Sequence, residues 1–257
     1  MKHILFFLFL LPAIAGTAQN TALVPPSAGP DTNRVDANNR KQGFWKISEA
    51  AVTWYGSYLD DRKEGSWTAY YPGGLLGMID SYKRGLKNGI SITIDRNGTF
   101  LGESYYVDGV LDGRSRAFYG GGRLKSEISY KNGKLNGTRR IYNPDGRLQE
   151  EGTYLNDVRN GVFVWYYVEG KPNTKSVYNN GNLDGVQTTY YKSGERESEV
   201  LYTNNMRQGP YTVYYENGKL KTEGRFVDDK EEGTWKNYNE EGKVLLQKYK
   251  KGEEIKK

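Results

Sequence analysis

Polar and apolar residues alternate over short stretches of this chain, and turn-forming residues bound each stretch. Residues 219–226 are typical. The even-numbered positions hold Leu, Thr, Gly and Phe, and the odd-numbered positions hold Lys, Lys, Glu and Arg. Such alternation is the pattern of a β-strand that packs one face and leaves the other in water. Similar stretches recur along the chain, so the pattern predicts an all-β protein.

Glycine sets the period of these stretches. One series, called the anchor glycines below, is spaced 24 residues apart: Gly65, Gly89, Gly113, Gly137, Gly161, Gly185, Gly209 and Gly233. A second glycine follows each of them nine residues later, from Gly74 to Gly242. A fixed period of this length is the signature of stacked supersecondary units.

Each unit carries the signals of two strands and two tight turns. The position four residues before each anchor glycine holds only Asp, Asn or Gly, as in the pair Asn132-Gly133. These residues tolerate positive φ and favour hairpin turns. An aromatic residue stands seven before each anchor and, except at Ile94, another stands five after. Because short turns join antiparallel neighbours, the sequence predicts an elongated single-layer antiparallel β-meander of about 17 strands.

Two segments resemble a known repeat. Tyr130 to Gly137 reads Tyr-Lys-Asn-Gly-Lys-Leu-Asn-Gly and resembles the MORN repeat (membrane occupation and recognition nexus). The stretch from Tyr214 to Leu220 is similar to its bacterial variant, whose members include exported, antitoxin-like proteins. The resemblance implies a twisted β-array that serves as a scaffold for protein contacts or for apposition to lipid. It carries over no catalytic residue.

The segments outside the array predict export. Residues 1–18 are typical of a secretory signal, because basic Lys2 precedes the apolar stretch 4–11 and small residues 16–18 permit cleavage before Gln19. We expect a flexible linker over 19–40, the repeat array over 41–253 and a charged tail over 254–257. The sequence does not choose between periplasm, cell surface and medium.

Composition excludes several classes of chemistry. The chain has no cysteine, and its one histidine, His3, lies in the expected signal. A Ser-His-Asp or Cys-His nucleophile and a His/Cys zinc site are therefore excluded, and we predict no enzyme, no cofactor and no metal site. Asp60-Asp61 and Asp228-Asp229 are read as solvated turn acids and not as a Ca²⁺ site. Export also argues against a nucleic-acid partner.

One strand is a candidate interface. Residues 162–168 read VFVWYYV and are apolar on both faces, whereas a strand in a one-layer sheet normally keeps one face polar. A partner protein, a second copy of the chain, or the folded-back tail or linker would cover it. We expect Phe163, Trp165 and Tyr167 to anchor such an interface, because large aromatic residues contribute much of interface energy.

Two further features are candidates for ligand binding. The net charge is +6, and Arg114, Arg116, Arg139 and Arg140 suggest a basic stripe for anionic lipid, acidic polysaccharide or an acidic protein face. The alternative is a solvated sheet face. A column of tyrosines six residues after the anchors offers rings for sugar stacking or packs within the sheet: Tyr71, Tyr119, Tyr167, Tyr191 and Tyr215.

The sequence therefore favours a non-enzymatic exported scaffold that binds a protein at the cell envelope, with an antitoxin-like or immunity-like role as one form of it. A glycan-binding or anionic-lipid-binding module is the first alternative, and a self-associating structural spacer is the second. The expected partner is an envelope protein, a second copy of the chain, a glycan or a lipid.

Overall fold

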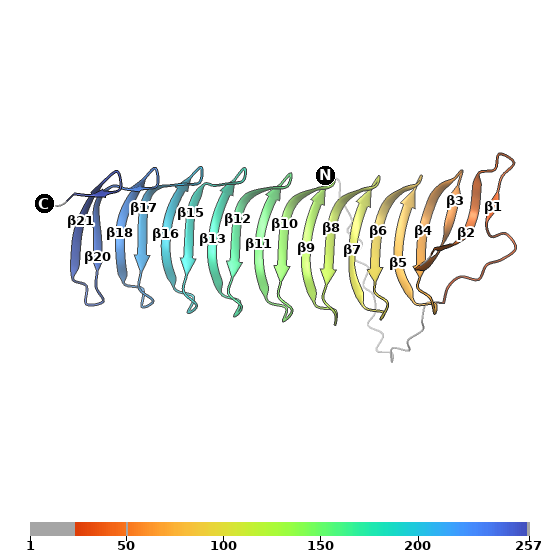
Figure 1. Cartoon of the computed structure of the whole chain (residues 1–257), viewed down its shortest axis with the longest axis horizontal. Coiled ribbons are helices and arrows are strands. Elements are labelled where there is room, and N and C mark those ends of the chain that lie inside the picture. The colour runs from red at the N-terminus through yellow and green to blue at the C-terminus, as the bar shows by residue number, and fades with distance from the viewer. Residues whose placement is uncertain (1–23, 50, 256–257) are drawn as a thin grey trace, which may run out of the picture.

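The computed structural model describes residues 24–49 and 51–255, and these form one open antiparallel sheet of 22 strands without a helix. Figure 1 shows the strands side by side along the long axis of the molecule. The strands are β1 (Arg34–Val35), β2 (Lys41–Glu49), β3 (Val52–Leu59), β4 (Arg62–Tyr70), β5 (Leu76–Lys83), β6 (Leu86–Ile94), β7 (Phe100–Val107), β8 (Val110–Phe118), β9 (Leu124–Lys131), β10 (Lys134–Tyr142), β11 (Leu148–Leu155), β12 (Val158–Tyr166), β13 (Pro172–Asn179), β14 (Asn182–Leu183), β15 (Gly185–Tyr190), β16 (Arg196–Thr203), β17 (Met206–Tyr214), β18 (Leu220–Val227), β19 (Lys230–Glu231), β20 (Gly233–Tyr238), β21 (Val244–Lys250) and β22 (Glu253–Glu254).

The connectivity is a meander, as the sequence predicts. Each long strand pairs antiparallel with the one before it and the one after it, for example β8 with β7 and β9. Three parts of the predicted organisation lie outside the described residues: the signal peptide over 1–18, linker residues 19–23 and tail residues 256–257. The single-layer β-meander is confirmed.

The predicted hairpin turns are also confirmed. Asn132 and Gly133 both have positive φ, 50° and 79°, as a two-residue type I′ turn requires. The Gly133 N–H donates to the Leu111 carbonyl of the preceding hairpin at 2.7 Å. Equivalent bonds recur one unit apart along this edge of the sheet, so each turn is held by the unit before it.

The strict alternation read from the sequence is interrupted by register shifts in most of the long strand pairs. At Tyr70, for instance, the register shifts so that Tyr70 opposes Leu76 while Ala69 opposes Met78. Leu76 therefore packs with Tyr55, Tyr70 and Ile79. The same shift occurs at Leu220, so Leu220 and Thr222 lie on opposite faces of the sheet. The sequence predicts them on the same face, and that part of the alternation expected for 219–226 is corrected.

One face of the sheet, called the ring face below, carries Trp67, Phe163 and Trp235. Each ring lies on a glycine of the neighbouring strand. A Cβ atom added to Gly56 would lie 2.2 Å from the Trp67 ring, and Gly152 and Gly224 stand in the same relation to Phe163 and Trp235. Trp67 and Phe163 are fully buried although the sheet has only one layer. The rings and the glycines together form the core on this face of the sheet.

The N-terminal end is capped by residues that the sequence assigns to a linker. Strand β1 pairs with Lys41 and Gln42 of β2. Asn33 continues this pairing: its N–H donates to the Phe44 carbonyl at 2.9 Å, and its side-chain oxygen accepts from the Lys46 N–H at 2.8 Å. The expectation of a flexible linker up to residue 40 is therefore wrong for its last part, because these residues pair with positions 41–46 on the outer edge of β2.

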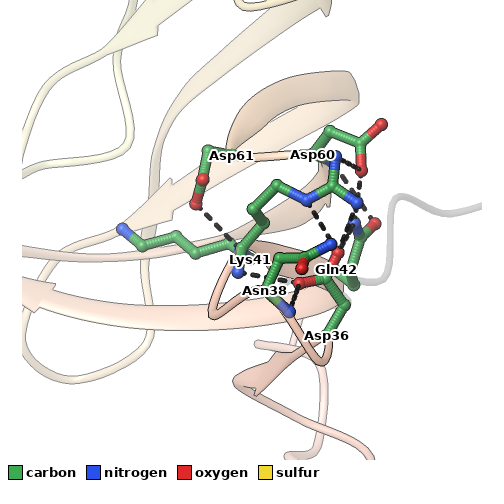
Figure 2. Close-up of polar contacts among 7 residues, drawn as sticks. Asp36, Asn38, Lys41, Gln42, Asp60 and Asp61 are labelled. Carbon is green, nitrogen blue, oxygen red and sulfur yellow. Dashed lines mark hydrogen bonds and ion pairs between the residues drawn. The ribbon is translucent and has the colours of Figure 1, made fainter.

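Asp36 organises this cap (Figure 2). Its carboxylate accepts hydrogen bonds from the backbone N–H groups of Asn38 and Arg40 at 2.9 and 3.0 Å, and it pairs with the Arg40 guanidinium. The backbone hydrogen bond from Arg40 is the main reason that the pKa of Asp36 falls to about 2. Asp61 accepts from the Lys41 N–H at 2.8 Å, which ties the cap to the turn after β3.

Candidate interaction surfaces

The strand expected to anchor an interface is β12, and its aromatic residues have different environments. Phe163 is fully buried. The rings of Tyr154 and Tyr178 meet it edge-on at 5.3 and 5.1 Å, and the Arg159 guanidinium lies 5.0 Å from its centroid. Neighbouring units thus supply the cover that the sequence assigns to a partner. Phe163 is a core residue, so the expectation that it anchors an interface is corrected.

The other two candidates on this strand are only half-buried. Trp165 lies beside Phe163 with 5.8 Å between ring centroids, and Tyr167 follows the end of the strand. The Tyr167 hydroxyl donates to the Tyr190 carbonyl at 2.7 Å. Its polar group is therefore used within the array.

The four arginines expected to form a basic stripe do not lie together. Arg139 opposes Gly152 on the ring face, whereas Arg114, Arg116 and Arg140 lie on the opposite face. Arg139 also forms an ion pair with Glu150 on its own face. The sheet therefore divides the stripe between two surfaces.

On the opposite face the arginines alternate with glutamates across successive strands. The row runs Glu103, Arg116, Glu127, Arg140 and Glu151. The Nε of Arg116 lies 2.8 Å from Glu103, and the Nε of Arg140 lies 2.8 Å from Glu151. These bonds raise the pKa of both arginines. With Arg114, which pairs with Glu127, the row has three arginines and three glutamates. It therefore presents little unpaired positive charge to an anion.

The tyrosine column expected to stack on sugars links one unit to the next. The Tyr191 hydroxyl donates to the Tyr214 carbonyl at 2.7 Å, and the Tyr215 hydroxyl donates to the Tyr238 carbonyl at 2.7 Å. The same bond recurs from Tyr71, Tyr119 and Tyr167. Of the two interpretations of this column, the structure supports packing within the sheet.

The acidic turns also bind the chain's own backbone. Asp229 accepts from the Arg207 N–H at 2.9 Å, and this hydrogen bond is the main reason that its pKa is lowered. In the part of the chain that the structure describes, no group of three His, Cys, Asp or Glu side chains is arranged to hold a metal ion. Nor does that part contain a helix long and apolar enough to cross a membrane.

The C-terminal edge carries Lys248, Lys250 and Lys251, which indicate protection against strand addition, but apolar residues precede them on the same strand. Val244, Leu245 and Leu246 begin β21 and are 44%, 62% and 60% exposed. Strand β20 pairs with their inner side, while β22 pairs only with Tyr249 and Lys250 on the outer side. Within 24–49 and 51–255, no strand covers the outer edge of 244–247. Three consecutive apolar residues on the last long strand were the available signal.

A hollow adjoins this open edge. Its volume is about 400 Å³, and Tyr215, Tyr238, Val244 and Leu245 contribute to its lining. The edge therefore offers unpaired backbone groups next to exposed apolar side chains and a hollow.

Comparison with known proteins agrees with this architecture. The model of the MORN repeat variant matches residues 111–132, 135–156, 183–204, 207–228 and 231–250. No curated protein matches the chain. MORN repeats are a non-catalytic type of repeat that generally serves protein or membrane interaction. The same turns and strand pairs continue through the unmatched units, such as β4 and β5. The chain therefore belongs to the MORN repeat family, in its variant form.

Proposed function

We propose that this chain is a non-enzymatic exported scaffold that binds a partner protein at the cell envelope, and that the partner adds a β-strand to the open edge of β21. The proposal rests on one observation: Leu245 and Leu246 are exposed on a strand whose outer backbone edge is uncovered. Strand addition uses main-chain hydrogen bonds for affinity and alternate side chains for specificity.

The details of the edge favour a protein strand. Leu245 opposes Asn237 and Leu246 opposes Lys236, so the two leucines lie on opposite faces of the sheet. An added strand would meet an apolar residue on each face. The hollow beside Leu245 would accept a large side chain of that strand. An edge left open in this way normally leads to association, and proteins that avoid it place charges or Pro there.

Photo-cross-linking in the producing cell tests this proposal. A photoreactive amino acid replaces Leu245 in one variant and Leu59, which is 58% exposed near the capped end, in the control. We expect an adduct with a different protein from position 245 and none from position 59. Equal adducts at both positions, or none at 245, would contradict the proposal. An adduct with a second copy of the chain would instead support the self-associating spacer.

Export has its own test. The support for it is the basic start, the short apolar stretch and the small residues 16–18, all outside the described residues. Mass spectrometry of the protein recovered from the producing cell should give an N-terminus at Gln19 and place the protein outside the cytoplasm. Recovery of intact residues 1–18 in the cytoplasmic fraction would reject export while leaving strand addition open.

A further inference from the structure

The ring face has an interruption in its core. Each unit has one pair of opposed residues on the ring face. One member lies two residues after the anchor glycine, and the other lies nine residues before it. Where the first is Trp67 or Phe163, the second is Gly56 or Gly152. Across β5 to β8 the corresponding pairs are Asp80 with Ser91 and Ser104 with Ser115. Small polar side chains replace the ring and the glycine at both.

These substitutions leave a hollow of about 440 Å³ on the ring face. Its floor comes from Ser91, Ser104 and Ser115, and Thr93 and Tyr106 border it. The Ser104 and Ser115 hydroxyls lie 2.8 Å apart. Each hydroxyl has one donor and two acceptor positions, so the pair retains hydrogen-bonding capacity toward a ligand. We call this region the serine hollow.

The charged residues that line the serine hollow are paired: Lys87 with Asp80 beside the hollow, and Arg116 with Glu103. Asp80 is 4% exposed, and its carboxylate accepts from the Lys87 ammonium at 2.8 Å and from the Ser91 hydroxyl at 2.6 Å. Burial, together with the charge of Asp80, raises the pKa of the adjoining Tyr82 to about 12, so its hydroxyl stays neutral. A charged ligand would find no uncompensated partner, and desolvating its charge would be costly.

A ring stands at the side of the hydroxyl floor. Tyr106 lines the hollow, and the Lys87 ammonium lies 5.2 Å from its ring centroid. A sugar combines hydroxyl groups with apolar C–H faces, so it matches a floor of hydroxyls beside an aromatic wall. A peptide side chain of the Phe or Trp type would leave the serines and Asp80 without water.

We infer that the serine hollow binds a neutral oligosaccharide. Sugar hydroxyls exchange hydrogen bonds with Ser91, Ser104 and Ser115, and one pyranose ring packs against Tyr106. The site lies on β5 to β8, far along the array from β21, and it does not depend on strand addition at that edge.

The chain itself supplies a variant that should close the hollow. Ser104→Gly with Ser115→Phe copies the pair Gly152 and Phe163, whose ring fits the sheet and is fully buried. Ser104→Ala with Ser115→Ala keeps the space and removes the hydroxyls. Ser198→Ala is the matched control, since Ser198 forms a similar hydroxyl pair with Thr189 at 2.7 Å on the same face, outside the hollow.

Calorimetric titration and saturation-transfer NMR of the purified full protein test the inference. The probes are trimers of glucose, mannose, galactose, xylose and N-acetylglucosamine at millimolar concentration, with trigalacturonate as the acidic comparison. We expect saturable binding of at least one neutral trimer. The double alanine variant should weaken it about tenfold, the ring-filling variant should abolish it, and Ser198→Ala should leave it unchanged.

Three results would overturn the inference. One is no binding by any neutral trimer, and another is binding that survives in both double variants. The third is preference for trigalacturonate over every neutral trimer. If the ring-filling variant fails to melt cooperatively, the double alanine variant still decides the outcome. Because none of these variants touches β21, their results are separate from the cross-linking at position 245.

Discussion

The two ends of the array solve the same physical problem differently. A sheet of stacked units exposes an unpaired backbone edge at each end, and such edges promote association. At the N-terminal end, β1 and Asn33 pair with β2, and Asp36 holds the cap in place. At the C-terminal end, β22 covers only the last residues of β21.

Side chains at the two ends differ in the same sense. The capped end is polar, with Asp36, Arg40 and Asp60 in ion pairs. The open end presents Leu245 and Leu246. The difference shows that a few residues, here β1 and Asn33, are enough to cover an edge strand in this fold. The open apolar edge on the same molecule is the basis of our proposal that a strand of a partner protein binds there.

The largest difference between the ends should appear in their buried tryptophans. Trp67→Ala removes a fully buried ring and the bond from its Nε1 to the Ser57 carbonyl at 3.1 Å, so unfolding free energy should fall by about 3–5 kcal/mol. The Nε1 of Trp235 is buried and lacks a partner among the described residues. Trp235→Ala should cost less, because the terminal unit can open locally. Denaturant unfolding of both variants measures this, and a larger loss for Trp235→Ala would contradict it.

Making the open edge resemble a protected one should abolish partner binding. Leu245→Lys with Leu246→Lys places charges on both faces of β21, which disfavours strand addition. Both side chains are mostly exposed, so stability should change by less than about 0.5 kcal/mol per residue. Leu59→Lys at the capped end is the control. Retention of the partner by the double variant in a pull-down would show that the edge is not its binding site.

The tyrosine links should weaken both ends by smaller amounts. Tyr71→Phe and Tyr215→Phe each remove one hydroxyl bond to a carbonyl of the next unit, and each should cost about 1 kcal/mol. Tyr105→Phe is the control, because Tyr105 is 45% exposed and lies outside the column. Thermal melting of the three variants checks this, and equal melting temperatures would mean that the column does not stabilise the array.

The smallest effect is the acid sensitivity of the cap. The pKa of Asp36 falls from 3.8 to about 2 in the folded protein, so its stabilisation is present above pH 3.8 and is lost as pH falls through about 2. Amide exchange at Asn38 and Arg40 should therefore accelerate between about pH 4 and pH 2 relative to the pH trend of unstructured amides. Asp36→Asn should remove that change, whereas residues 244–247 should show none. The same acceleration in the variant would contradict the assignment to Asp36.

Local rules were enough to predict the repeat fold. The spacing of Gly65 and its successors, and pairs such as Asn132-Gly133, act within a few residues, so their consequences can be read from the sequence. The one-residue register shifts at positions such as Tyr70 could not be predicted from the sequence, because the alternation is the same up to the bulge.

Surface properties were predicted less well because they depend on cross-strand neighbours. Arg140 meets Glu127 and Glu151 only once the register is known. Phe163 reads as an exposed anchor until Gly152 is placed beneath it. Pairing the residue nine before each anchor with the residue two after it would have found the rings, the serine hollow and the buried Asp80.

Backbone hydrogen exchange, measured on the free protein and on its non-covalent complex with the partner identified by cross-linking, tests the central claim most directly. In the free protein, the amides of 41–46 should be protected by the cap, while the outward-facing amides of 244–247 should exchange rapidly. Partner binding should slow exchange at 244–247 and leave 41–46 unchanged. Protection that appears elsewhere in the array, with 244–247 still exchanging rapidly, would contradict strand addition at the open edge.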